Sequence, residues 1–286
     1  MNKVNIIDVM NDANKTGWAL AAFNIPSFDA MRAVMTASKD NGTPVIVQLS
    51  SKIVEHYGAK VLKSWFDTIQ NHLKSVCFIH LDHCRDEKIL RDCINSRWDM
   101  VMFDGSYLNI EDNIKFTEKY VKIAHKLNVA VEGEIGVIGG QEDNINGIVD
   151  YAKLDEVQLL CSKTKLDCVA VGFGNIHGNY VNKSKLRWSI FEGAYKKSMI
   201  PLVLHGGTGL THGEFKRAIK AKAAKINIST DIKNIYFKDL NDCDLEKLKQ
   251  NPYLFHETVY NNVYKLSSSY IKLFKKKEIT VNDTCN

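Results

Sequence analysis

Long apolar runs are missing from this sequence of 286 residues, and none approaches the roughly 18 residues that a helix needs to cross a bilayer. Cys-x-x-Cys pairs are missing too, and the seven cysteines are an odd number without regular spacing. Polar Asn2, Lys3 and Asn5 stand among the first residues, where a secretory leader would be apolar. These absences predict a soluble, cytoplasmic protein with reduced thiols.

A large excess of charge of one sign is also missing. The formal net charge is +5, which suits anionic partners such as sugar phosphates but is too small and too dispersed to predict nucleic-acid binding. The most basic run, Lys275–Lys277, is interpreted as a solvated helix end or tail. We therefore expect a small-molecule substrate and neither a nucleic acid nor a membrane as partner.

What the sequence does contain is a series of short, continuous apolar runs separated by longer stretches of helical periodicity. Such runs are typical of parallel strands that are covered on both faces. The expected strands are Trp18–Phe23, Val45–Leu49, Val76–Leu81, Met100–Phe103, Val129–Glu132, Cys168–Gly172, Leu202–Leu204 and Lys225–Ile228. The clearest crossover helices are Ala30–Lys39, Ile110–His125, Leu154–Ser162 and His212–Ala221.

Uninterrupted alternation of this kind predicts an α/β fold, a (β/α)₈ TIM barrel. An open doubly wound sheet is the alternative, and it is disfavoured because no Gly-x-Gly-x-x-Gly follows the first run. No linker rich in Gly, Pro or Ser divides the chain. We expect residues 1–286 to form one barrel domain with a C-terminal helical extension from about residue 240.

Three histidines each follow a different expected strand, and the carboxyl ends of barrel strands meet at one rim. They are His83, His177 and His205. Three imidazoles with one open position are typical of a catalytic zinc site, although residue type alone leaves cobalt, iron or manganese open. Glu134 is a further ligand or orients one of these histidines, whereas His80 is interpreted as a neighbour of the site.

Glycines and carboxylates stand at the same rim. Gly206, Gly207 and Thr208 follow the seventh run, where barrels commonly build a phosphate site from backbone N–H groups. Asp82 directly precedes a candidate ligand and is therefore the preferred acid–base residue. Glu142 lies on a glycine-flanked loop that we expect to close over substrate with a proton donor.

Taken together and in this order, these motifs resemble the class II fructose-bisphosphate and tagatose-bisphosphate aldolase family. The likeness runs from Ala22 to Asp231, and its most specific segments are residues 80–83, 131–143, 177–178 and 204–209. It implies that His83, His177 and His205 hold zinc and that Glu134 is associated with the metal. It also implies that Asp82 takes the proton of the C4 hydroxyl and that Glu142 exchanges a proton with the three-carbon product.

The resemblance further implies the substrate contacts. The residues that fall where the family binds the sugar and its C1 phosphate are Asn24, Ser50, Gly178, Gly206, Gly207, Thr208, Asn227, Thr230 and Asp231. A monovalent cation is often found near that phosphate site, and relatives are homodimers or homotetramers. The loop after His177 and the lysine-rich segment from Leu240 depart from the family pattern, so the contacts to a second phosphate are not predicted.

The predicted reaction is cleavage of a ketose 1,6-bisphosphate to dihydroxyacetone phosphate and glyceraldehyde 3-phosphate, with Zn²⁺ stabilising the enediolate. Asp231, in place of the glutamate associated with tagatose-type relatives, favours fructose 1,6-bisphosphate over its C4 epimer, tagatose 1,6-bisphosphate. Two other interpretations are a zinc-dependent hydrolase on the same barrel and a non-catalytic partner subunit. The glycines after the last two strands disfavour the first, and the three retained histidines disfavour the second.

Overall fold

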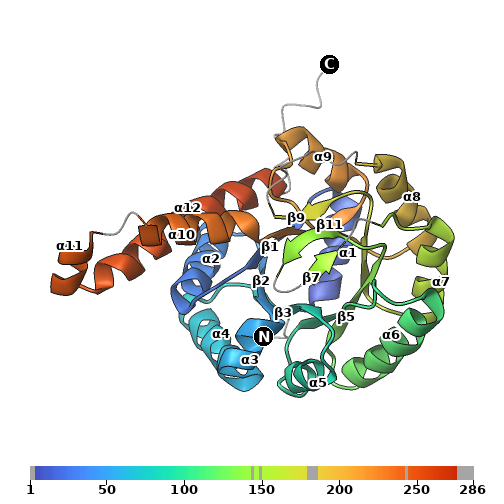
Figure 1. The fold of residues 1–286 in the computed structure, drawn as a ribbon, viewed down its shortest axis with the longest axis horizontal. Coiled ribbons are helices and arrows are strands. Elements are labelled where there is room, and N and C mark those ends of the chain that lie inside the picture. Colours follow the sequence, from blue (N-terminus) through green and yellow to red (C-terminus); the bar gives the residue numbers. More distant parts are fainter. Residues whose placement is uncertain (1–3, 143–144, 148–149, 179–185, 242–243, 276–286) are drawn as a thin grey trace.

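Eight parallel strands close into a barrel in the computed structural model, which describes residues 4–142, 145–147, 150–178, 186–241 and 244–275. Their order around the barrel is β1-β11-β10-β8-β5-β4-β3-β2 (Figure 1). The bounds are β1 Leu20–Asn24, β2 Val45–Ser50, β3 Cys77–Cys84, β4 Met100–Phe103, β5 Ala130–Ile135, β8 Cys168–Val171, β10 Leu202–Leu204 and β11 Ala223–Ile228. The predicted TIM barrel is confirmed, and β3 and β5 extend further into the motifs than the apolar runs indicated.

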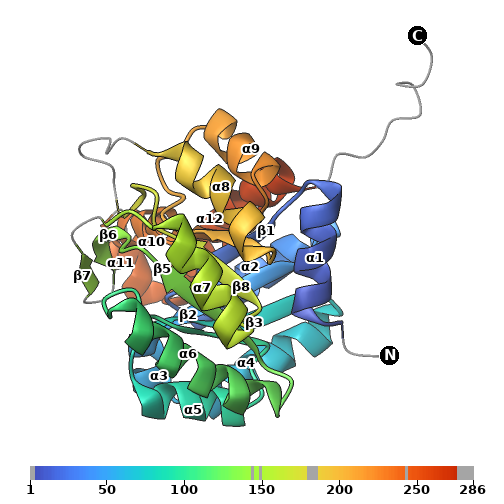
Figure 2. The same ribbon diagram turned by 90° about the vertical axis from the view of Figure 1, so that its right-hand side faces the viewer.

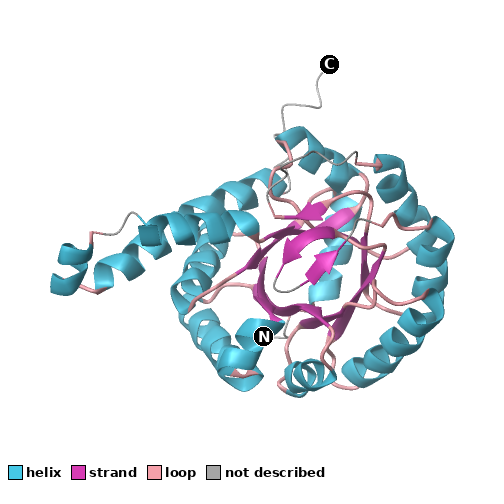
Figure 3. Cartoon of the chain, in the orientation of Figure 1, coloured by secondary structure: helices cyan, strands magenta, loops and turns pink. Residues whose placement is uncertain are grey.

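Helices surround the barrel on its outer face (Figure 3). They are α2 Phe28–Asn41, α3 Ser51–Tyr57, α4 Ala59–Leu73, α5 Glu87–Asn95, α6 Ile110–His125, α7 Leu154–Thr164, α8 Trp188–Ser198, α9 His212–Lys220 and α12 Tyr253–Phe274. Their ends carry local capping signals. Thr211 and Glu214 form a capping box at the start of α9, and Gly42 adopts the left-handed conformation that ends α2.

Two apolar layers hold this arrangement together. The outer layer packs the strands against the helices, with Phe23, Val47 and Ile79 among its members. The inner layer fills one end of the barrel, where α1 (Ile6–Thr16) packs Ile6 and Met10 against the strands. α1 closes the end of the barrel that lies away from β6 and β7 (Figure 2). The apolar layer therefore occupies that end, and polar side chains can gather at the other end.

A small three-stranded sheet lies over that other end of the barrel (Figures 1 and 3). It contains β6 (Gly139–Glu142), β7 (Ile145–Gly147) and β9 (Ile176–His177). β6 pairs in parallel with β9, so Gly140 lies opposite His177. The prediction that Glu142 lies on a loop is therefore wrong for the backbone of residues 139–142, which form a strand beside a candidate ligand.

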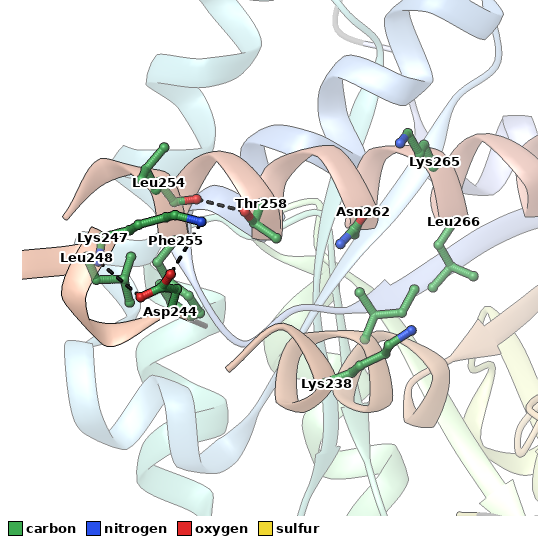
Figure 4. Close-up of a pocket in the computed structure, with 11 residues that line it drawn as sticks. Lys238, Asp244, Lys247, Leu248, Leu254, Phe255, Thr258, Asn262, Lys265 and Leu266 are labelled. Carbon is green, nitrogen blue, oxygen red and sulfur yellow. Dashed lines mark hydrogen bonds and ion pairs between the residues drawn. The ribbon is translucent and has the colours of Figure 1, made fainter. Parts of the chain in front are cut away.

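The C-terminal helices α10 (Thr230–Asn241), α11 (Leu245–Gln250) and α12 form an arm that projects from the barrel (Figure 1). The longest helix of the arm, α12, runs back to the barrel, where it packs against α2 and β1. A cavity of about 760 Å³ lies between the three helices of the arm and is lined by none of the predicted site residues (Figure 4). Within the described segments, no helix is long and apolar enough to span a membrane.

Candidate active site

The three predicted histidines meet at the end of the barrel that the small sheet covers. His83 belongs to β3, His177 to β9, and His205 directly follows β10. One ring nitrogen from each lies within 4.8 Å of the other two, and all three side chains are buried. The ring centroids are 4.6 Å apart for His83 and His205 and 4.9 Å apart for His83 and His177. His83 and His177 are more than 90 positions apart in the sequence, yet their side chains meet at one centre.

An irregular backbone at the end of β3 turns two successive side chains toward the interior. In a regular strand Asp82 and His83 would point to opposite faces. The pairing of β3 with β4 shifts register between Leu81 and Cys84, and His83 has a φ of 39°, a left-handed conformation that is uncommon outside glycine. Strain of this kind is of order 1–3 kcal/mol and is found mainly at functional sites.

The donor set fits a metal ion. His205 Nε2 lies 2.7 Å from the Glu132 carboxylate, which can only accept, so the ring proton is assigned to Nε2 and Nδ1 keeps its lone pair. That Nδ1 faces His83 Nε2 at 2.8 Å. Zinc binds imidazole nitrogen at about 2.0–2.1 Å, so a small opening of this pair admits the ion. Two ligand nitrogens that face each other in a carboxylate-rich pocket are what a divalent cation requires.

The surrounding carboxylates make the pocket attractive to a cation. Burial alone would lower the pKa of His83, but the nearby Asp82, Asp104 and Glu134 carboxylates hold that pKa well above its usual range. Burial and the neighbouring Asp104 raise the pKa of Glu134 to about 8. Glu134 Oε2 is buried, has no hydrogen-bond partner among the described residues and lies 3.8 Å from His205 Nδ1. Such an orphaned oxygen beside the histidines supports its predicted association with the metal.

Asp104 was not predicted and lies within this cluster. Its Oδ2 is 3.7 Å from His83 Nδ1 and 2.7 Å from a guanidinium nitrogen of Arg85. Together with His83 and Glu134 it forms a second group whose ligand atoms lie within 4.8 Å of one another. The available signal was its position, because Asp104 directly follows β4, as a candidate site residue follows several other strands.

Amide side chains hold the candidate base, Asp82. Asn24 Nδ2 donates to Asp82 Oδ2 at 2.8 Å, and Asn227 Nδ2 approaches Asp82 Oδ1 at 3.4 Å. Gln48 fixes Asn24 in turn, because its Nε2 donates to Asn24 Oδ1 at 2.7 Å. Asn24 and Asn227, predicted as substrate contacts, are thus placed against the carboxylate next to the histidines.

The glycines after β10 have a packing reason as well as their predicted one. Gly206 has a φ of 67°, and a Cβ on it would lie 2.2 Å from the Ile176 carbonyl oxygen in β9. A Cβ on Gly207 would lie 2.7 Å from the Asn227 carbonyl oxygen. Only residues without a side chain let this loop lie against both neighbouring strands. The next residue, Thr208, accepts a hydrogen bond at its Oγ1 from the Asp231 backbone N–H at 3.3 Å.

The remaining predicted contacts lie around the same rim. Thr230 and Asp231 begin α10, and the Asp231 carboxylate accepts a hydrogen bond from the Tyr270 hydroxyl on α12. Ser50 and Asn24 line a cavity of about 320 Å³, together with Lys52 and Lys233. Gly178 follows His177, and residues 179–185 lie outside the described residues. The side chain of Glu142 also lies outside what the structure describes.

The other histidines stand apart from the cluster. His80 Nδ1 lies 3.2 Å from Gln48 Oε1, and its Nε2 lies 3.8 Å from Glu132 Oε2. It is therefore a buried neighbour and not a member of the ligand group. His56, His72, His125, His212 and His256 all lie on helices.

Fold and side chains together define a (β/α)₈-barrel protein with a buried group able to hold a metal ion at one end of the barrel. The family model described as fructose-bisphosphate aldolase class-II matches residues 4–278. The chain belongs to this family: it is a class II aldolase, a lyase of a family that acts on sugar phosphates and is zinc-dependent in general.

Individual relatives of similar sequence identity carry different names. The chain is 32% identical to the fructose-bisphosphate aldolase of Geobacillus stearothermophilus, over 87% of this chain and 91% of that protein. It is also 32% identical to the 6-phospho-5-dehydro-2-deoxy-D-gluconate aldolase of Shouchella clausii, over 81% of this chain and 80% of that protein. The solved structure of the YdjI aldolase from Escherichia coli K12 shares the fold, with a TM-score of 0.81, 24% identity and coverage of 96% and 97%.

Proposed function

We propose that this aldolase cleaves fructose 1,6-bisphosphate to dihydroxyacetone phosphate and glyceraldehyde 3-phosphate. The observation that carries the proposal is the three-histidine group with Asp82 directly before His83 in β3, a carboxylate whose two oxygens face Asn24 and Asn227. Retro-aldol cleavage needs a base for the C4 hydroxyl and a way to stabilise the negative charge that the departing aldehyde leaves behind. These residues supply both in one buried place.

Asp82 is the proposed base. The residue is only 2% exposed, and the two asparagine amides restrict the rotation of its carboxylate. A hydroxyl at C4 would give its proton to Asp82 as the C3–C4 bond breaks, and the electron pair of that bond would remain on the three-carbon fragment. Glu142 is the proposed acid that returns a proton to that fragment. Its backbone lies in β6, which pairs with the strand that carries His177.

His83, His177 and His205 are the residues that would hold zinc, with Glu134 as an associated carboxylate. When bound, zinc supplies a Lewis acid that stabilises negative charge on the sugar oxygens. Glu132 supports this set by accepting from His205 Nε2, which leaves Nδ1 of that ring for the ion. Burial excludes water from this group and strengthens each of these electrostatic interactions.

The phosphate end of the substrate is proposed to lie on the loops after β10 and β11. Gly206, Gly207 and Thr208 form the first loop, and Thr230 and Asp231 start the helix that follows the second. The N-terminus of α10 adds backbone N–H groups that favour an anion. A monovalent cation near the phosphate belongs to the same proposal, as do sugar-hydroxyl contacts from Asp231 and rim contacts from Asn24, Ser50 and Gly178.

The choice among substrates is open to a direct test. We expect kcat/KM for fructose 1,6-bisphosphate to exceed that for the C4 epimer, tagatose 1,6-bisphosphate, by about tenfold or more, because a hydroxyl that loses its hydrogen bonds costs at least roughly 1.4 kcal/mol. The measurement is zinc-dependent release of dihydroxyacetone phosphate. A third arm uses 6-phospho-5-dehydro-2-deoxy-D-gluconate, the compound named for a relative. A higher kcat/KM for either of the other two compounds contradicts the proposal.

We also propose that residues 1–286 form a single barrel domain with a helical extension, that the chain works in the cytoplasm, and that it assembles as a homodimer or homotetramer. The arm supports the assembly, because Phe237, Leu245 and Tyr253 on its helices are each at least 61% exposed. Light scattering on the purified protein should give a mass of two or four chains. A mass of one chain, 32.4 kDa, across micromolar concentrations contradicts the assembly.

A further inference from the structure

A lysine is buried in the barrel beneath the histidine cluster. Among the lysines and arginines whose side chains the structure describes, Lys225 in β11 alone is fully buried, with an exposed fraction of 0%. Its Nζ lies 2.8 Å from Oε2 of Glu132, which is also 0% exposed. Burial alone would raise the pKa of Glu132, but Lys225 and His205 hold that pKa well below its usual range. A cation in this position has a cost that a merely apolar filling would avoid.

The backbone of β11 is shaped to bring this side chain inside. β11 pairs with β10 through Leu202 and Ala223 and then through Val203 and Lys225, so Ala224 is an extra residue in the ladder. As a result, Ala224 packs in the inner apolar layer while the next residue, Lys225, also reaches the interior. Regular alternation would have put these two side chains on opposite faces. Bulges next to active sites commonly redirect a side chain in this way.

The ion pair between Lys225 and Glu132 lies in direct contact with His205, a proposed metal ligand. Glu132 uses its two oxygens on different partners: Oε2 accepts from Lys225 Nζ at 2.8 Å and more weakly from Cys168 Sγ at 3.8 Å, and Oε1 faces His205 Nε2 at 2.7 Å. With both oxygens anchored, the carboxylate cannot rotate out of the plane that His205 needs. The ring of His205 is thereby held with Nδ1 toward His83 Nε2, 2.8 Å away.

We infer that Lys225 is a positioning residue for the metal site: through Glu132 it fixes the orientation of His205. The inference rests on the proposed function only in taking His205 as a metal ligand. Lys225 itself is proposed to touch neither the substrate nor the ion. Its contribution is the geometry of the ligand set before the ion arrives.

The test is zinc affinity of the full-length protein with Lys225→Met, a substitution of similar length without charge. Affinity is measured by competition with a chromophoric chelator, and the Tm of the metal-free protein is measured beside it. We expect a weakening of about 10–100-fold, as for other residues that orient metal ligands. The matched control is Lys222→Met in the turn that precedes β11, where the lysine Nζ donates to the Asn14 carbonyl oxygen. It should lower Tm without changing zinc affinity.

A parent-like zinc affinity in folded Lys225→Met would overturn the inference. If that variant does not fold because Glu132 is left as an unpaired buried charge, Glu132→Gln with Lys225→Met removes both charges together. We expect this double variant to bind zinc at least tenfold more weakly than the parent, and parent-like binding by it also overturns the inference. Failure of the proposed metal site looks different, because the parent protein itself would then bind no zinc at the histidines, and failure of the proposed substrate would leave all these zinc affinities unchanged.

Discussion

Asp82→Asn should lower kcat for cleavage by about 10²–10⁴-fold, the usual contribution of a positioned general base. Asparagine has nearly the shape of aspartate, and its amide oxygen can still accept from Asn24, which now donates to Asp82 at 2.8 Å. The variant should therefore fold and keep the zinc content of the parent. What it loses is the ability to take a proton. The measurement is kcat at saturating substrate, with zinc content determined on the same sample.

Asp99→Asn is a matched control for this experiment. Asp99 is also a buried carboxylate, but its Oδ2 accepts from the Ile79 backbone N–H, and the residue precedes β4 at the opposite end of the strand from Asp104. Asparagine at this position should retain the turnover of the parent. If Asp82→Asn cleaves substrate at the rate of Asp99→Asn, Asp82 is not the base and another group must accept the C4 proton.

Removal of the metal should have an effect of similar size. Treatment with a strong chelator is expected to lower the rate of cleavage by at least about 10²–10³-fold, because a Lewis acid contributes several kcal/mol of charge stabilisation in the transition state. Added zinc should restore the rate. The Tm should also rise with zinc, since an ion present at about 1,000 times its Kd stabilises the folded state by about 4 kcal/mol.

Histidine variants locate the ion. Alanine at His83, His177 or His205 should abolish zinc-dependent stabilisation, because each ring offers a nitrogen to the same centre. His125→Ala is the control, since His125 lies on α6, is 42% exposed and pairs with Asp167. Full cleavage after complete removal of metal, or zinc binding that survives all three substitutions, would show that the histidine cluster is not the metal site.

The sequence was most informative where burial is local and periodic. Continuous apolar runs predicted all eight barrel strands, because a strand covered on both faces needs apolar residues at every position. The apolar runs ended before the true strand ends wherever polar site residues take the place of apolar ones. β3 continues to Cys84 and β5 to Ile135, and the added positions include Asp82, His83 and Glu134. An apolar pattern ends at the first polar residues, whereas the backbone hydrogen bonds between neighbouring strands continue past them.

The candidate site divides in a similar way. His83, His177 and His205 could be named because each follows a strand run, and parallel strands bring their ends to one rim. Glu132 and Lys225 could not be recognised as site residues in this way, because each is a single polar residue at the edge of an apolar run. Their pairing at 2.8 Å depends on a bulge in β11, and bulges leave no periodic trace in a sequence. The Tyr270 hydroxyl reaches Asp231 from a helix whose direction no local pattern sets.

The amino-acid sequence by itself determined the class of fold, the order of the strands and the residue types at their ends, because these follow from local periodicity and from the rule that parallel strands end together. The tertiary structure alone decided which atoms face one another: the ring nitrogens of the three histidines, the amides that hold Asp82, and the buried ion pair behind His205. Such contacts join residues far apart along the chain, so their geometry depends on the closure of the whole barrel and is not encoded in any one segment.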